Sequence, residues 1–181
     1  CPTCCSCWPG FLHAPIARAK CCGTTTAATP ERPADTVILY THPACLGHDP
    51  GNGHPEKSAR LAVVLEGLRE KHAGQEWREA PLAKLGDLRR VHDESLLQAV
   101  LDTGFEGHRR LDPDTVICAQ SGAAALRAAG AAVAGVDAVM NGETSTVFCA
   151  VRPPGHHATA DAAMGFCLIN SVAVAAAYAL D

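Results

Sequence analysis

Two adjacent histidines, His156 and His157, are the residues of this chain best suited to chemistry, because an imidazole exchanges protons near neutral pH. On an extended strand, neighbouring side chains would point to opposite faces. The residues before the histidines are Pro153, Pro154 and Gly155. The prolines fix φ, and glycine enters backbone regions closed to other residues. We therefore expect both imidazoles to turn into one site, where they could transfer protons.

The apolar run at residues 147–151 predicts the element that positions this motif. A continuous apolar run is typical of a parallel strand buried on both faces. Open α/β sheets bind their ligands at the carboxyl ends of such strands. We therefore expect residues 152–157 to form an active-site loop at the end of a buried strand.

Strands and helices are expected to alternate along the chain, which predicts a mostly parallel sheet covered on both faces. Asp93 is a candidate cap for one helix, and Asp114 or Thr115 for a longer one that ends at Asn141-Gly142. Residues 41–54 contain too many prolines and glycines for regular structure. The spacing of apolar residues predicts strands at residues 36–40, 83–91 and 145–151, and helices at residues 56–71, 96–101, 116–140 and 170–180.

The sequence PPGHHA at residues 153–158, followed by MGFCLIN at residues 164–170, resembles the histone deacetylase family of zinc-dependent amidohydrolases. The similarity is greatest to the bacterial class II-like deacetylases and acetylpolyamine amidohydrolases. Weaker support comes from HPE at residues 54–56 and from residues 111–115. The resemblance extends over residues 36–181 and implies the α/β, three-layer αβα arginase/deacetylase fold, truncated here at the C-terminus.

The resemblance also implies an activity: removal of acetyl groups from lysine-like amines, in acetylated proteins or acetylpolyamines. By position, His157 would act as general base and later as acid, and His156 would assist electrostatically. Gly165 and Phe166 would line the channel for the acyl-lysine stem. His54 would contact the substrate or anchor a loop near the rim.

Family members hold Zn²⁺ with an Asp-x-His pair and a more distant Asp, which we expect after Asp181. No metal ligands are therefore assigned within this chain, and Tyr178 lies inside an expected helix rather than at the site. The chain alone is expected to be inactive and, with the strand at residues 146–151 left at an edge, prone to aggregate. The alternatives are a non-catalytic binding domain or pseudoenzyme of the same descent, and an unrelated alanine-rich binding module.

Two other kinds of site are compatible with single residue types. Cys167 or Cys149 with His157 could form a Cys-His hydrolase, but no orienting residue stands at a recognisable position. Asp112 and Asp114 could ligate a metal, although their place ahead of an expected helix favours capping and loop hydrogen bonds.

Residues 1–35 are expected to lie outside the folded domain, as a disordered or artefactual cysteine-rich segment. A four-thiolate zinc site is a candidate here, but adjacent cysteine pairs make poor metal-binding turns. A signal peptide is weakly suggested, without a basic start or a continuous apolar core. The thiolate candidates are Cys1, Cys4, Cys21 and Cys22.

Composition limits the class of protein. The 181 residues suffice for one domain, and 48% hydrophobic with 19% charged residues is typical of a globular fold. A net charge of −4 gives no reason to expect nucleic acid or an anionic membrane as partner. The apolar residues 123–140 are interrupted by Arg127 and Asp137, which predicts a buried or half-buried helix. Scattered cysteines in the domain favour a reducing, cytoplasmic location, and oligomeric state leaves no mark in the sequence.

Overall fold

The part of the chain that the computed structural model describes, residues 36–181, alternates short strands with helices. The expectations for residues 1–35 therefore lie outside the described residues. The elements in chain order are β1 (Val37–Thr41), α1 (Ala44–Gly47), α2 (Ser58–Lys71), β2 (Glu76–Glu79), α3 (Leu85–Leu88), α4 (Glu94–Leu101), β3 (His108–Asp112), β4 (Thr115–Cys118), α5 (Ser121–Met140), β5 (Thr146–Cys149) and α6 (Ser171–Ala179).

A parallel sheet of order β2-β1-β5 forms the centre of this fold. Its middle strand, β1, consists mostly of apolar residues, and its three central residues are buried. Leu39 of β1 pairs with Trp77 of β2 on one side and with Phe148 of β5 on the other. The strands predicted at residues 36–40 and 145–151 are therefore confirmed.

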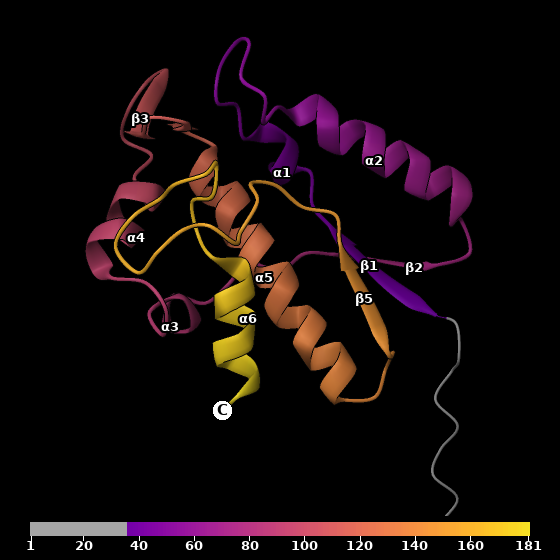
Figure 1. Ribbon diagram of the computed structural model, residues 1–181. Coiled ribbons are helices and arrows are strands. Elements are labelled where there is room, and N and C mark those ends of the chain that lie inside the picture. Colours follow the sequence, from indigo (N-terminus) through magenta and orange to yellow (C-terminus); the bar gives the residue numbers. More distant parts are fainter. Residues whose placement is uncertain (1–35) are drawn as a thin grey trace, which may run out of the picture. The chain divides into compact units, whose positions relative to one another are not determined.

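Helices cover the two faces of this sheet, with α2 on one side and α5 on the other (Figure 1). Leu61 and Leu65 of α2 form one apolar cluster with residues that flank the sheet. Ala131 and Ala138 of α5 pack against Ile38 and its neighbours on the opposite face. The three-layer αβα architecture and the mostly parallel sheet are thereby confirmed.

Small residues allow α5 to lie close to its neighbours. A Cβ at Gly130 would collide with the carbonyl oxygen of Pro81, and one at Gly135 would lie 3.0 Å from the Val147 side chain. By length and composition alone α5 could cross a membrane, but nearly half of its most apolar stretch is buried within the protein. The expected half-buried helix is therefore observed.

The largest apolar cluster among the described residues lies among α3, α4, β4, α5 and α6. It contains two residues of the segment after the histidines, Leu168 and Ile169, which are 0% and 2% exposed. Because these side chains are locked into a core, the segment leading into α6 has little freedom to move. The helix partners in this cluster include Leu88, Leu96, Leu97, Val100, Ala125, Ala129 and Val174.

The strand predicted at residues 83–91 is wrong. These residues form α3 and a turn, and the second strand of the sheet is β2, at residues 76–79. Leu85, Leu88 and Val91 stand three residues apart, which suits a helical turn better than a strand. β2 escaped prediction because its sequence, EWRE, has no apolar run.

The start predicted for the long helix is also wrong. The helix expected at residues 116–140 begins at Ser121, and residues 115–118 form β4, which pairs antiparallel with β3. Thr115, Val116 and Ile117 are β-branched and favour a strand. Asp114 and Thr115 consequently cap no helix. The predicted end is confirmed, with Gly142 in the left-handed region at φ +74°.

Two further helices follow the expected pattern. The helix expected at residues 56–71 is α2, and the one at 170–180 is α6, whose N-cap Asn170 accepts a hydrogen bond from the backbone of Ala173. Asp93 stands at the N-cap of α4 but makes no side-chain cap hydrogen bond. The segment expected to be irregular, residues 41–54, contains the short helix α1.

Candidate active site

The loop after β5 brings the two histidine rings side by side. The backbone N–H of Ala150 donates to the carbonyl of Tyr40 at 2.8 Å, so pairing with β1 continues one residue past the end of β5. The centroids of the His156 and His157 rings are 4.2 Å apart, with the ring planes tilted by 46°. Both side chains are exposed to solvent. The Pro-Pro-Gly sequence thus directs adjacent imidazoles to one place, as expected.

Gly155 fastens this loop to the start of α6. Its carbonyl accepts a hydrogen bond from Val172 at 3.1 Å. A Cβ at Gly155 would lie 2.5 Å from the hydroxyl of Ser171, so only glycine permits this approach. The helix therefore supports the loop immediately before the first histidine.

Gly165 and Phe166 form the wall next to the histidines, and both have left-handed backbone conformations at φ +57° and +66°. A Cβ at Gly165 would lie 2.8 Å from the His157 ring. Phe166 has a side chain, so this left-handed conformation is sterically strained. Two hydrogen bonds hold the wall: Gly165 N–H donates to Asp114 Oδ1 at 3.1 Å, and Phe166 N–H donates to Thr115 Oγ1 at 3.0 Å.

These residues border a cleft of about 710 Å³. Its size suits a small ligand or a long side chain. The lining includes His156, His157, Gly165, Phe166, Asp114, Arg60, Leu61, Val64 and Phe148.

His54 stands beside this wall and does not line the cleft. Its Nδ1 accepts the backbone N–H of Glu56 at 3.1 Å, which leaves Nε2 to donate to the carbonyl of Asp114 at 3.0 Å. Its ring meets Phe166 edge-on, with centroids 5.1 Å apart. The geometry thus supports loop anchoring, and direct contact between His54 and a substrate stays a prediction.

The histone deacetylase domain model matches residues 54–181, more than half of the chain. The chain belongs to the histone deacetylase family. It is 38% identical to the histone deacetylase-like amidohydrolase of Pseudomonas aeruginosa, over 74% of this chain and 34% of that protein. It is 34% identical to the human polyamine deacetylase HDAC10, over 80% of this chain and 22% of that protein.

Solved structures of the histone deacetylase family share this fold. The HDA15 HD domain superposes with a TM-score of 0.76 at 30% identity, covering 80% of this chain and 43% of that one. The chain spans about half or less of the length of the curated relatives it matches. The comparisons therefore show the fold and the family of this chain, which corresponds to a part of the length of its relatives.

Of the roles expected for Asp112 and Asp114 in this deacetylase-family chain, the structure shows loop hydrogen bonding for Asp114. Asp112 ends β3, and Asp114 stands in the turn before β4, where its carboxylate accepts bonds from Thr115 and Gly165. The Thr115 hydroxyl, more than any other group, lowers the pKa of Asp114. Among residues 36–181, no three His, Cys, Asp or Glu side chains are grouped so as to hold a metal ion. The expected loop hydrogen bonding is therefore confirmed for Asp114, and the expected helix capping is wrong, because the next helix begins at Ser121.

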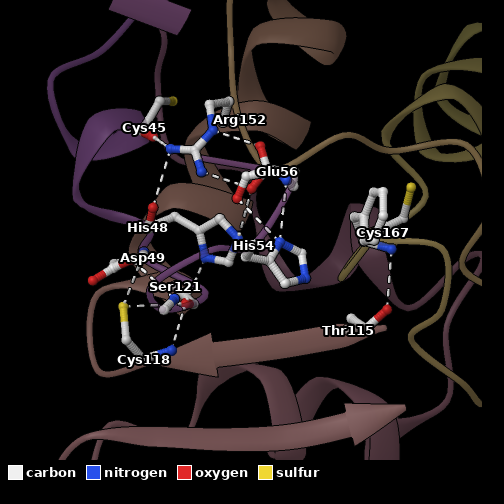
Figure 2. A network of polar contacts seen from close by, with 12 residues as sticks. Cys45, His48, Asp49, His54, Glu56, Thr115, Cys118, Ser121, Arg152 and Cys167 are labelled. Atoms are coloured by element: carbon white, nitrogen blue, oxygen red, sulfur yellow. Dashed lines mark hydrogen bonds and ion pairs between the residues drawn. The ribbon is translucent and has the colours of Figure 1, made fainter. Parts of the chain in front are cut away.

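A buried network behind the histidines escaped sequence analysis. Arg152 and Glu56 form an ion pair, and His48 and Ser121 extend it (Figure 2). Burial alone would raise the pKa of Glu56, but hydrogen bonds from His48 and Arg152 outweigh it and hold the value at about 2. The only hint in the sequence was that Glu56 belongs to the HPE segment and that Arg152 directly precedes PPGHHA.

His92 is a second residue that the sequence did not reveal, since it was placed at the end of a strand. It is 3% exposed. Its Nδ1 donates to the carbonyl of Thr159 at 2.8 Å, and its Nε2 accepts the backbone N–H of Asn170 at 2.9 Å. Burial lowers its pKa, in keeping with a neutral ring. His92 thus connects the segment after the histidines with the start of α6.

The cysteines near the site are poor nucleophile candidates. Burial raises the pKa of Cys149 to about 11, so its thiol stays protonated near neutral pH. Cys167 is 0% exposed, and its sulfur contacts the backbone of His156 and Gly165. The Cys-His alternative therefore has little support in this geometry.

Proposed function

We propose that the protein hydrolyses the acetyl amide of a lysine-like amine, either acetyl-lysine in a protein or an acetylated polyamine. The observation that carries the proposal is the pair of adjacent imidazoles, 4.2 Å apart, which line a cleft together with Gly165 and Phe166. Relatives named as an amidohydrolase and as a polyamine deacetylase support the reaction class.

The histidines account for the proton transfers of such a reaction. When water attacks the acetyl carbon, His157 accepts a proton from it. His157 then donates a proton to the amine nitrogen as the C–N bond breaks, which yields acetate and the free amine. His156, beside it, stabilises the charge that develops on His157. General acid–base catalysis of this kind contributes about 10²–10⁴-fold to a rate.

The wall residues account for binding of the alkyl stem. The Phe166 ring can pack along a methylene chain, and glycine at 165 lets a substrate approach the backbone. Each methylene buried there contributes about 0.8 kcal/mol. A lysine side chain and a polyamine both present such a stem, so both are included as substrates.

Zinc dependence is part of the proposal, because water must be activated to attack an amide. Residues 36–181 do not form a set of metal ligands, so the ligands are proposed to lie outside the described residues, and the 181-residue chain alone is proposed to be inactive. The alternative is a non-catalytic binding domain of the same descent, which would need no metal ligands among residues 36–181.

The test is acetate release by the natural protein from an acetyl-lysine peptide and from an N-acetylated diamine. Replacing His157 with Gln should lower kcat by about 10²-fold or more, because the proton carrier is lost. His72→Gln, an exposed residue next to the end of α2, is the matched control and should leave kcat unchanged. If wild-type protein with bound zinc releases no acetate from either compound, the binding-domain alternative is favoured.

A further inference from the structure

Arg152 is buried and makes hydrogen bonds to three different residues. It is 4% exposed and lies four residues before His156. Its guanidinium donates to both carboxylate oxygens of Glu56, at 2.5 and 2.6 Å. The remaining terminal nitrogen donates to the carbonyls of Cys45 at 2.9 Å and His48 at 3.1 Å. One side chain thus joins the end of α1, the start of α2 and the loop after β5.

The carboxylate of Glu56 is equally enclosed, at 6% exposure. His48 Nε2 lies 3.3 Å from Glu56 Oε2, and because a carboxylate only accepts, Nε2 is the donor of this contact. On the other side of the ring, His48 Nδ1 lies within hydrogen-bond distance of the Ser121 hydroxyl, at 2.7 Å. Ser121 is the first residue of α5, so the network also reaches the helix on the other face of the sheet.

The connection from Arg152 to the histidines is short and stiff. Only Pro153, Pro154 and Gly155 intervene. The two prolines have fixed φ angles, and Gly155 is pressed against Ser171. Little rotational freedom remains between the guanidinium and His156, so a shift of Arg152 is passed on to the imidazoles.

We propose that Glu56 and Arg152 form a clamp that positions the His156–His157 loop for proton transfer. The two are positioning residues, and the proposal rests on the proposed deacetylase activity. Separating the two charges would leave each of them buried without a partner, which is strongly destabilising. The ion pair therefore favours a single geometry. Misplacing catalytic groups by about 1 Å can cost about 10²-fold in rate.

The experiment uses the natural protein with Glu56→Gln or Arg152→Lys, and Glu94→Gln as the matched control. Glu94 pairs with Arg89 on the surface, where both side chains are more than half exposed (54% and 52%). For each variant, ring ¹H–¹³C NMR signals of His156 and His157 are recorded well below the melting temperature. Acetate release from an acetyl-lysine peptide or N-acetylated diamine gives kcat and KM.

We expect Glu56→Gln to shift the ring signals of both histidines and to lower kcat by about 10²-fold, with KM within about threefold of wild type. Glu94→Gln should change neither. A purely structural role would lower the melting temperature and leave the ring signals and kcat of the folded protein unchanged, and that result overturns the proposal. Should Glu56→Gln not fold, Arg152→Lys, which keeps the charge, must show the same shifts and kcat loss.

Failure of the proposed function gives a different pattern. If wild-type protein hydrolyses neither compound while the ring signals of the Glu56→Gln variant move, the clamp stands and the deacetylase activity does not. Unmoved signals in both folded variants overturn the clamp whatever the activity.

Discussion

Gly165 lies so close to His157 that any side chain there must move the imidazole. In Gly165→Ala, the new Cβ would meet the His157 ring at 2.8 Å, at a backbone φ of +57° that alanine rarely adopts. We expect a loss of about 2–4 kcal/mol in the free energy of unfolding, from strain and overpacking together. We also expect a shift of the His157 ring signals. Chemical denaturation and NMR measure the two effects.

The control separates strain from collision. Gly142 has φ +74° with no atom near its Cβ position, so Gly142→Ala carries the strain alone. It should cost about 1–2 kcal/mol and leave the His157 signals in place. Equal losses in the two variants would show that Gly165 does not press on the ring.

Glu56 makes stability depend on acid pH. Its pKa in the folded protein is about 2, below the ordinary value of 4.5, because hydrogen bonds from His48 and Arg152 outweigh its burial. A lowered pKa means that the stabilisation is complete above about pH 4.5 and is lost as the pH falls toward 2. The loss should be on the order of 3 kcal/mol.

Urea unfolding of wild type and Glu56→Gln between pH 2 and pH 5 measures this effect. Glu56→Gln should be less stable near pH 5 and should show a flatter dependence on pH. Parallel curves for the two proteins would contradict the assignment of this acid dependence to Glu56.

The sequence motif revealed the residues at the cleft but not those behind it. His156, His157, Gly165 and Phe166 stand within eleven residues of one another, so one contiguous stretch identified them. Arg152 and Glu56 are 96 residues apart, and His92 and Asn170 are 78 apart. Such pairings depend on how the sheet and helices bring distant segments together, and a single sequence carries no direct sign of them.

At the scale of elements, His92 joins the segment after the histidines to α6 only while its ring is neutral. A protonated ring could not accept the N–H of Asn170. Burial lowers the pKa of His92 below its ordinary value of 6.5, so its contribution to stability is complete above about pH 6.5 and falls as the pH falls below it. We expect His92→Gln to remove this part of the pH dependence of unfolding.

Thermal unfolding between pH 5 and pH 8 tests this. His72→Gln, which alters an exposed ring, should keep the wild-type dependence. If both variants keep it, His92 does not titrate as its surroundings indicate.

Helix α5 and helix α2 offer a matched pair of glycines. A Cβ at Gly130 would collide with the carbonyl of Pro81, whereas Gly67 has open space around its Cβ position. Gly130→Ala should therefore destabilise by about 1–3 kcal/mol. Gly67→Ala should stabilise by about 0.5–1 kcal/mol, because alanine is the better helix former. The melting temperatures of the two variants measure these effects. A Gly130→Ala variant more stable than wild type would contradict the close packing of α5.

The helices and strands were predictable where the spacing of apolar residues in the sequence matches the pattern of buried residues in the element. The central strand β1 is mostly apolar, and α2 carries Leu61 and Leu65 at helical spacing. β2 lies at the edge of the sheet, where polar residues are tolerated, and so gave no pattern. Residues 115–118 are apolar and directly precede an alanine-rich helix, so their strand could not be separated from it by period alone.

At the scale of the whole described chain, apolar surface remains exposed around β5. Among the described strands, β5 pairs only with β1. Phe148 and Met140 are 46% and 73% exposed, and Met140 lines a groove of about 430 Å³ between α5 and β5. Exposed apolar strands at a sheet edge promote association. We expect the 181-residue chain to self-associate with rising concentration, as sedimentation would show.

A lysine on the edge strand should reduce this association. Phe148→Lys places a charge on β5, and the control Val63→Lys places one on an exposed position of α2, 68% exposed. Only Phe148→Lys should lower the apparent mass. A monomeric chain with a cooperative thermal transition would contradict the prediction.

The contact between Gly155 and Ser171 has a consequence for variation within this fold. Since the hydroxyl of Ser171 lies 2.5 Å from the place where a Cβ of residue 155 would stand, the size of residue 171 affects how closely the loop can approach α6. A larger residue at 171 would press against Gly155 and the loop that carries the imidazoles. The position of the two imidazoles thus depends in part on a residue of α6, a helix that contributes no side chain to the lining of the cleft.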